Sequence, residues 1–159
     1  MTLHGPVPKS DKVSIKAATA ADLHRLTDLL RKYYKFDRIP FDRLAVRSGL
    51  EILLREKSLG RAWFIYRGRR RAGYVILTFG FDLEFGGRQA TITDLYLEPR
   101  YRGKGVGREV LRLVEGFCKK SGVRALELQV SADNSRATRF YQRFGFQAHD
   151  RVPMSKQLG

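Results

Sequence analysis

The chain has 159 residues, the length of one domain, since domains commonly run to about 100–200 residues. It carries 31 Lys and Arg against 16 Asp and Glu, and the net charge of +15 favours anionic partners. The absence of an apolar run of about 18 residues excludes a spanning helix, and a single cysteine excludes an internal disulfide. We therefore expect a cytoplasmic protein without a bound metal.

The first third of the chain predicts an extension, a strand and two helices. Residues 1–11 lack the apolar core of a secretion signal, and we expect them to be an N-terminal extension to one domain over residues 12–159. Lys12–Ala18 alternates polar and apolar residues, which predicts a strand. Leucines and tyrosines at helical spacing up to Tyr34 predict an amphipathic helix, and a second helix reaches about Lys57.

Aromatic and β-branched residues then predict three hairpin-linked strands. Ala62–Tyr66 and Gly73–Phe79 flank a basic turn, and Ala90–Leu97 follows a tight turn at Gly86-Gly87. We interpret the basic turn, Arg67–Arg71, as a solvated hairpin tip. A nucleic-acid patch is the alternative, but short basic clusters are weak motifs.

The C-terminal part predicts further helices and strands. Gly105–Ser121 is a long amphipathic helix, Ala125–Val130 a strand and Ser135–Phe144 a short helix, and one or two last strands follow from Phe146. This order predicts an α/β fold with a mixed, mostly antiparallel sheet of six to seven strands and about four helices.

A glycine-rich loop joins the strand that ends at Leu97 to the long helix. Between Arg102 and Arg108, glycine stands at three alternate positions. Glycine lets backbone N–H groups turn toward a ligand, and a helix start offers free N–H groups and partial positive charge. A P-loop would need Lys-Ser/Thr after its last glycine, and a dinucleotide fingerprint would need Gly-x-Gly-x-x-Gly. The loop therefore predicts a pyrophosphate site of another kind, with a flexible connector as the alternative.

A second motif lies downstream, where Asn134 opens a helix and Phe140-Tyr141 closes it before Gly145-Phe146. With the loop pattern Arg102-x-x-Gly105-x-Gly107, it resembles motifs B and A of the GCN5-related N-acetyltransferase (GNAT) superfamily. The pattern is most similar to the spermidine/spermine and diamine acetyltransferases. The resemblance implies the GNAT fold, with a splayed pair of parallel strands, and transfer of acetyl from acetyl-CoA to an amine.

The resemblance also implies how acetyl-CoA binds. The pantetheine arm would bond to the backbone of the strand at the splay, and the loop N–H groups would hold the pyrophosphate. Asn134 would reach the pantetheine, although helix capping alone explains it equally well. The implied cofactor-binding residues are Leu95, Tyr96, Leu97, Arg102, Gly103, Lys104, Gly105, Val106, Gly107, Arg108, Asn134 and Tyr141.

Two catalytic roles follow from the same resemblance. Tyr141 would give a proton to the departing CoA thiolate, and a packed core aromatic is the alternative. Asp94 would take the proton of the amine, directly or through water, and the N–H of Leu97 would polarise the thioester oxygen. Asp82 and Glu84 are alternative bases or substrate-binding groups, or simply solvated hairpin charges.

We expect direct transfer to a small-molecule amine of the polyamine, diamine or amino acid type. Thr93 stands where some polyamine enzymes have an acid, which argues against a polyamine. A protein N-terminus or lysine is the second acceptor class. A non-catalytic domain that binds CoA or nucleic acid is the alternative of another kind, although we expect no strong nucleic-acid binding. No membrane partner is expected, and a homodimer is compatible with these patterns.

Overall fold

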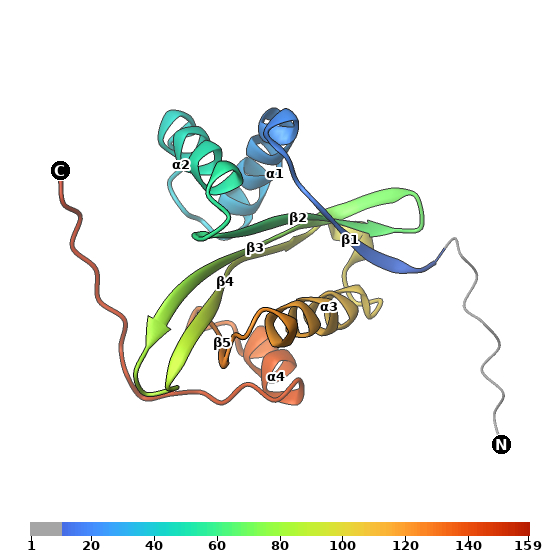
Figure 1. Cartoon of the computed structure of the whole chain (residues 1–159). Coiled ribbons are helices and arrows are strands. Elements are labelled where there is room, and N and C mark those ends of the chain that lie inside the picture. The colour runs from blue at the N-terminus through green and yellow to red at the C-terminus, as the bar shows by residue number, and fades with distance from the viewer. Residues whose placement is uncertain (1–10) are drawn as a thin grey trace, which may run out of the picture. The chain divides into compact units, whose positions relative to one another are not determined.

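A computed structural model describes residues 11–159, so the expected N-terminal extension lies almost wholly outside the described residues. The helices and strands follow one another largely in the expected order (Figure 1). In chain order they are β1 (Val13–Ala17), η1 (Ala20–Asp22), α1 (Leu23–Phe36), α2 (Arg43–Arg55), β2 (Gly60–Arg67), β3 (Arg70–Asp82), β4 (Gly87–Leu97), η2 (Pro99–Tyr101), α3 (Val106–Lys120), β5 (Ala125–Leu128) and α4 (Ser135–Arg143).

The strands form one sheet in the order β1-β2-β3-β4-β5. The first three pairings are antiparallel, and β4 and β5 are parallel. The tight turns contain Gly68 and Gly86, whose φ angles of 60° and 71° lie where glycine is favoured. The expected mixed sheet with a parallel pair is therefore confirmed.

The expected strand count of six to seven is wrong for the described residues, which contain five strands. The missing strands were expected from Phe146 onward, where the chain is irregular. Pro153 lacks a backbone N–H donor, and the neighbouring Val152 and Met154 are 79% and 93% exposed. This segment therefore has neither a continuous donor row nor a buried face to hold it in a sheet.

Helices cover both faces of the sheet over residues 11–129 (Figure 1). On one face, α1 and α2 pack against the strands through an apolar cluster that includes Leu26, Leu30, Leu50 and Phe64. The other face meets α3, where the Phe117 ring lies 5.0 Å from that of Trp63. Successive strand residues point to opposite faces of the sheet, so neighbouring aromatic residues of β2 pack against different helix layers.

Residues 130–159 form a second compact unit, which we describe by itself. Within it, α4 begins at Asn134, whose side chain accepts a hydrogen bond from the Ala137 N–H at 3.1 Å. No helix among residues 11–159 has both the length and the apolar character needed to cross a bilayer.

The basic hairpin tip differs from the expected solvated turn at one residue. Arg69 and Arg70 are exposed as expected. Arg71 is only partly exposed, and its guanidinium carbon lies 4.7 Å from the centre of the Phe64 ring. This contact is a cation–π interaction, so Arg71 belongs to the packed part of the protein.

Candidate active site

The glycine loop forms an open N-terminus of α3. Gly105 is the residue before the helix, in the left-handed conformation with φ of 78°, and a Cβ built there meets no atom within 4 Å. The first helical hydrogen bond runs from the Glu109 N–H to the Gly105 carbonyl at 3.3 Å. The N–H groups of residues 106–108 therefore have no acceptor within the helix. These donors and the open space beside Gly105 fit a pyrophosphate group.

β4 separates from β5 just before this loop. The parallel pairing ends where Ile92 meets Leu128. On the other side, Ile76 faces Asp94 and Leu77 faces Ile92, so Thr93 is the extra residue of a β-bulge. Beyond the bulge, residues 93–97 have no strand partner on the β5 side among the described residues.

The open edge of β4 presents backbone groups of Leu95 and Leu97. The Glu98 N–H donates to the Ala72 carbonyl at 2.8 Å, so the backbone N–H of Glu98 points toward β3. Alternate residues of an antiparallel strand bond to opposite sides, which directs the N–H groups of Leu95 and Leu97 toward the open edge. An extended amide ligand such as pantetheine could bond to these groups as an added strand does.

Arg102 ties the start of the loop to the end of β4. Its Nε donates to the Leu97 carbonyl at 2.8 Å. Its guanidinium carbon lies 4.2 Å from the Phe36 ring centre and 5.5 Å from that of Tyr96. The charge of Arg102 is thereby directed toward the strand end and α1, so its backbone, rather than its side chain, remains available to the pyrophosphate. The Lys104 and Arg108 side chains are exposed.

Asp94 is a buried carboxyl group held by a tyrosine. It is 9% exposed, and the Tyr74 hydroxyl donates to its Oδ2 at 2.8 Å. Burial raises the pKa of Asp94, while the hydrogen bonds from Tyr74 and Thr93 oppose this and the charge of Asp37 adds to it. A carboxylate with a raised pKa is a better proton acceptor than a solvated one, as a general base requires.

The Tyr74 that bonds to this carboxyl group belongs to a cluster of four tyrosines, which the sequence did not predict. The rings of Tyr33, Tyr74 and Tyr96 lie 6.0–6.4 Å apart, and Tyr34 lies 5.8 Å from Tyr33. Burial and the charge of Asp94 raise the pKa of Tyr34. From the sequence alone, Tyr33 and Tyr34 belong only to the apolar stripe of the first helix. Tyr74 and Tyr96 lie opposite each other on β3 and β4. This pairing of the strands is the signal that could have indicated the other half of the cluster.

The structure does not bring Asp82 and Glu84 to Asp94. Asp82 ends β3 and accepts a hydrogen bond from the Glu84 backbone N–H at 2.9 Å, as in a hairpin turn. Asp82 lies six positions along β3 from Ile76, the partner of Asp94, which corresponds to about 20 Å. This separation argues against a role for either carboxylate as the base.

Tyr141 lies in the unit formed by residues 130–159. Its ring packs edge-to-face against the rings of Phe140 and Phe146, whose centres lie 5.1 and 5.8 Å away. Burial raises the pKa of Tyr141, so the phenol holds its proton at neutral pH. The packing fits a core aromatic and the retained proton fits a general acid, so both interpretations of Tyr141 stay open.

The glycine loop, the open edge and the buried carboxyl group are the features that the resemblance implies for an acetyltransferase. The chain belongs to the acetyltransferase (GNAT) family, whose sequence profile matches residues 23–146. This match confirms the family that the resemblance of the two motifs implies.

Several known proteins are similar along most of the chain. A thialysine N-epsilon-acetyltransferase from Bos taurus is 25% identical, over 85% of this chain and 84% of the relative. A spermidine N(1)-acetyltransferase from Thermoplasma acidophilum is also 25% identical, over 87% and 90%. An integron cassette protein from the mobile metagenome of Cole Harbour Salt Marsh has a solved structure with a TM-score of 0.79 and 30% identity, covering 91% of this chain and 90% of that one.

Other relatives match only in part. Uncharacterised N-acetyltransferases from Methanocaldococcus jannaschii and Bacillus subtilis are 35% and 39% identical, over 40% and 45% of this chain. The chain spans only 28% and 45% of their own lengths.

Proposed function

We propose that this protein transfers acetyl from acetyl-CoA to the primary amine of a small molecule, of the polyamine, diamine or amino acid type. The observation that carries the proposal is the buried Asp94, next to the bulge at which β4 opens. The thioester would lie along the same edge, where the Leu95 and Leu97 N–H groups point. A proton acceptor and a thioester site at one strand end are what attack by an amine requires.

The surroundings of Asp94 support a cationic acceptor. Tyrosine rings attract ammonium groups through their faces, and Tyr33, Tyr34 and Tyr96 contribute three such rings. Asp37, at the end of α1, adds a second carboxylate, and Tyr33 donates to it at 3.4 Å. An ammonium bound here would have to lose a proton before attack, which is the role we assign to Asp94.

The transfer would proceed without an acetyl-enzyme. The amine nitrogen bonds to the thioester carbon while the carbon–sulfur bond breaks, and the Leu97 N–H donates to the carbonyl oxygen. Asp94 accepts the amine proton, and Tyr141 gives its proton to the thiolate. Cys118, the only cysteine of the sequence, is buried on α3, and burial raises its pKa to about 11, so it is a poor nucleophile.

The acceptor class can be tested by competition. With acetyl-CoA limiting, equal concentrations of spermidine, free lysine and a lysine-containing peptide should yield acetylated small amines in clear excess, because the site around Asp94 is built for a compact cation. Mass spectrometry of the products measures the ratio. Preferred acetylation of the peptide would contradict the proposal and would favour the second acceptor class, a protein N-terminus or lysine.

The pH dependence of the reaction should report on Asp94. Its ionised form accepts the proton, so kcat/KM should fall as the pH drops through the raised pKa of Asp94. The Tyr74 hydrogen bond lowers that pKa, so Tyr74→Phe should shift the acidic limb to higher pH. Tyr66→Phe, on β2, serves as the control and should leave the profile in place. An unshifted limb in a folded Tyr74→Phe variant would argue that Asp94 is not the base.

A further inference from the structure

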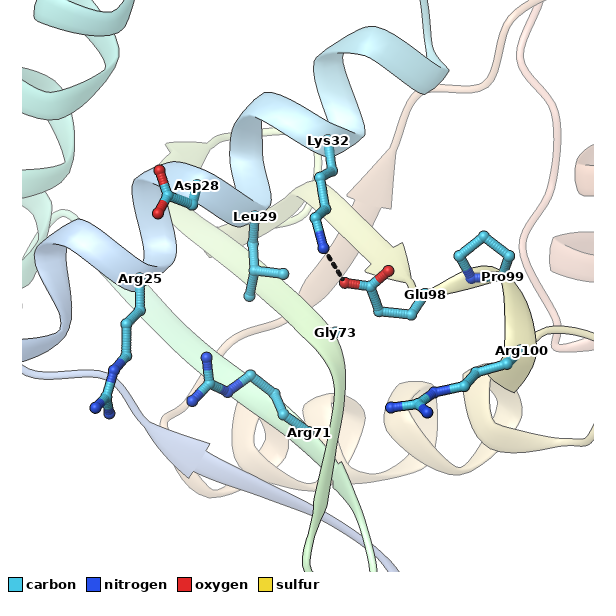
Figure 2. A pocket seen from close by; sticks show the side chains of 9 residues that line it. All are labelled: Arg25, Asp28, Leu29, Lys32, Arg71, Gly73, Glu98, Pro99 and Arg100. Atoms are coloured by element: carbon cyan, nitrogen blue, oxygen red, sulfur yellow. Dashed lines mark hydrogen bonds and ion pairs between the residues drawn. The ribbon is translucent and has the colours of Figure 1, made fainter.

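A pocket of about 610 Å³ lies between α1, the start of β3 and the end of β4 (Figure 2). No residue of the glycine loop or of α3 lines it, so it is separate from the expected pyrophosphate site. Its lining is strongly charged. The charged residues that line it are Arg25, Asp28, Lys32, Arg71, Glu98 and Arg100.

Both carboxylates of the pocket already have cationic partners. The Lys32 ammonium donates to Glu98 Oε1 at 2.8 Å, which connects α1 to the end of β4. Asp28 accepts from Arg43 at 3.2 Å, outside the pocket, and also lies 3.3 Å from His24. In Figure 2, the Asp28 carboxylate lies against α1, above Arg25 and Arg71, and no dashed line joins it to either arginine.

Three arginines of the pocket have no carboxylate partner. Among residues 11–159, neither Arg25 nor Arg71 nor Arg100 forms an ion pair. Residues 1–10 contain no Asp or Glu that could supply one. Figure 2 shows the Arg71 guanidinium extended toward Arg25, and that of Arg100 extended toward Arg71. Like charges that line one pocket repel one another, and an anion bound among them would offset that repulsion.

Arg71 is held in place rather than free to move into solvent. Its guanidinium lies 4.7 Å from the centre of the Phe64 ring, which is 3% exposed. Its Nε is buried and has no hydrogen-bond partner among the described residues. The terminal N–H groups of Arg71 are not buried in this way, so they can bond to an anion within the pocket.

We propose that this pocket binds the phosphate group of a small phosphomonoester. Four cationic and two anionic side chains line it, which leaves two positive charges. A phosphate monoester carries about −1.5 to −2 at neutral pH, whereas a carboxylate carries one charge. Guanidinium groups match phosphate oxygens with two parallel N–H donors. A volume of about 610 Å³ is within the usual size of small-ligand pockets.

The bound phosphate would connect two parts of the domain. Arg25 lies on α1, and Arg100 lies in η2, which leads into the glycine loop. A ligand that contacts both would favour one placement of α1 relative to the start of the loop. We therefore expect phosphate to stabilise the folded protein as its concentration passes the dissociation constant.

The test uses the full chain without acetyl-CoA or amine, so it does not depend on activity. Inorganic phosphate and O-phosphoserine should bind saturably in calorimetry and raise Tm, compared with acetate at matched ionic strength. Arg25→Gln and Arg100→Gln remove exposed side chains, and each should weaken phosphate binding about tenfold or more. Arg69→Gln removes the same charge at the exposed hairpin tip and should leave the affinity unchanged.

Three outcomes would overturn the proposal. Phosphate could behave like acetate, which would show only general charge screening. The Arg25→Gln and Arg100→Gln variants could bind as tightly as Arg69→Gln. Saturating acetyl-CoA could displace phosphate competitively, which would make the pocket part of the cofactor site.

Arg71→Gln is not needed for the test, because loss of its stacking on Phe64 also affects folding.

Discussion

Gly105→Glu should abolish acetyl-CoA binding in a protein that still folds. The substitution places a carboxylate in the open space beside the N–H groups of residues 106–108. Hydrogen bonds to charged groups contribute about 1.5–3 kcal/mol each, so the loss of two lowers affinity on the order of 100-fold or more. Calorimetric titration with acetyl-CoA measures the effect.

Gly122→Glu is the matched control for this variant. Gly122 follows the other end of α3, has φ of 73° and also has open space around its Cβ position. A side chain in the left-handed region costs about 1–2 kcal/mol at either glycine, so both variants have a similar backbone strain. Only Gly105→Glu should lose the cofactor. Equal affinity in the two folded variants would refute the assignment of the loop.

Tyr141→Phe should lower kcat by about 10²–10⁴ and change the affinity for acetyl-CoA no more than a few-fold. The substitution keeps the ring that packs against Phe140 and Phe146 and removes only the hydroxyl. Because burial raises the pKa of Tyr141, the wild-type phenol is protonated and able to donate at neutral pH. Steady-state release of the CoA thiol measures kcat.

The same experiment separates the two interpretations of Tyr141. Thermal unfolding of Tyr141→Phe should remain near that of the wild type, which assigns the loss to chemistry rather than to packing. Tyr66→Phe, in the sheet, removes a hydroxyl elsewhere and should retain full turnover. A fully active Tyr141→Phe variant would mean that Tyr141 is a core aromatic only.

The fold was largely predictable because its signals are local. Hydrophobic periodicity gave the helices within one or two residues, and the tight turns at Gly68 and Gly86 set the hairpins. One or two further strands were expected from the pattern after Phe146, but the exposed, proline-containing segment around Val152 has no buried face to hold it in the sheet.

The site was predictable only where the sequence motif is contiguous. The open N-terminus at Gly105 follows from a short run of glycines before a helix. The bond between Tyr74 and Asp94 spans 20 residues and depends on the bulge at Thr93, which shifts the register by one. The contact of Arg102 with Leu97 and Phe36 likewise joins segments whose approach no local pattern indicates.

The proposed activity is transfer of acetyl from acetyl-CoA to a small primary amine without an acetyl-enzyme. The most direct measurement is the release of CoA thiol from acetyl-CoA by the purified chain, with and without spermidine or lysine, alongside the mass of the protein. We predict thiol release that depends on the amine, one acetylated amine per thiol, and no acetylated protein. Release without an amine, or an acetyl group left on the chain as an intermediate, would contradict the account.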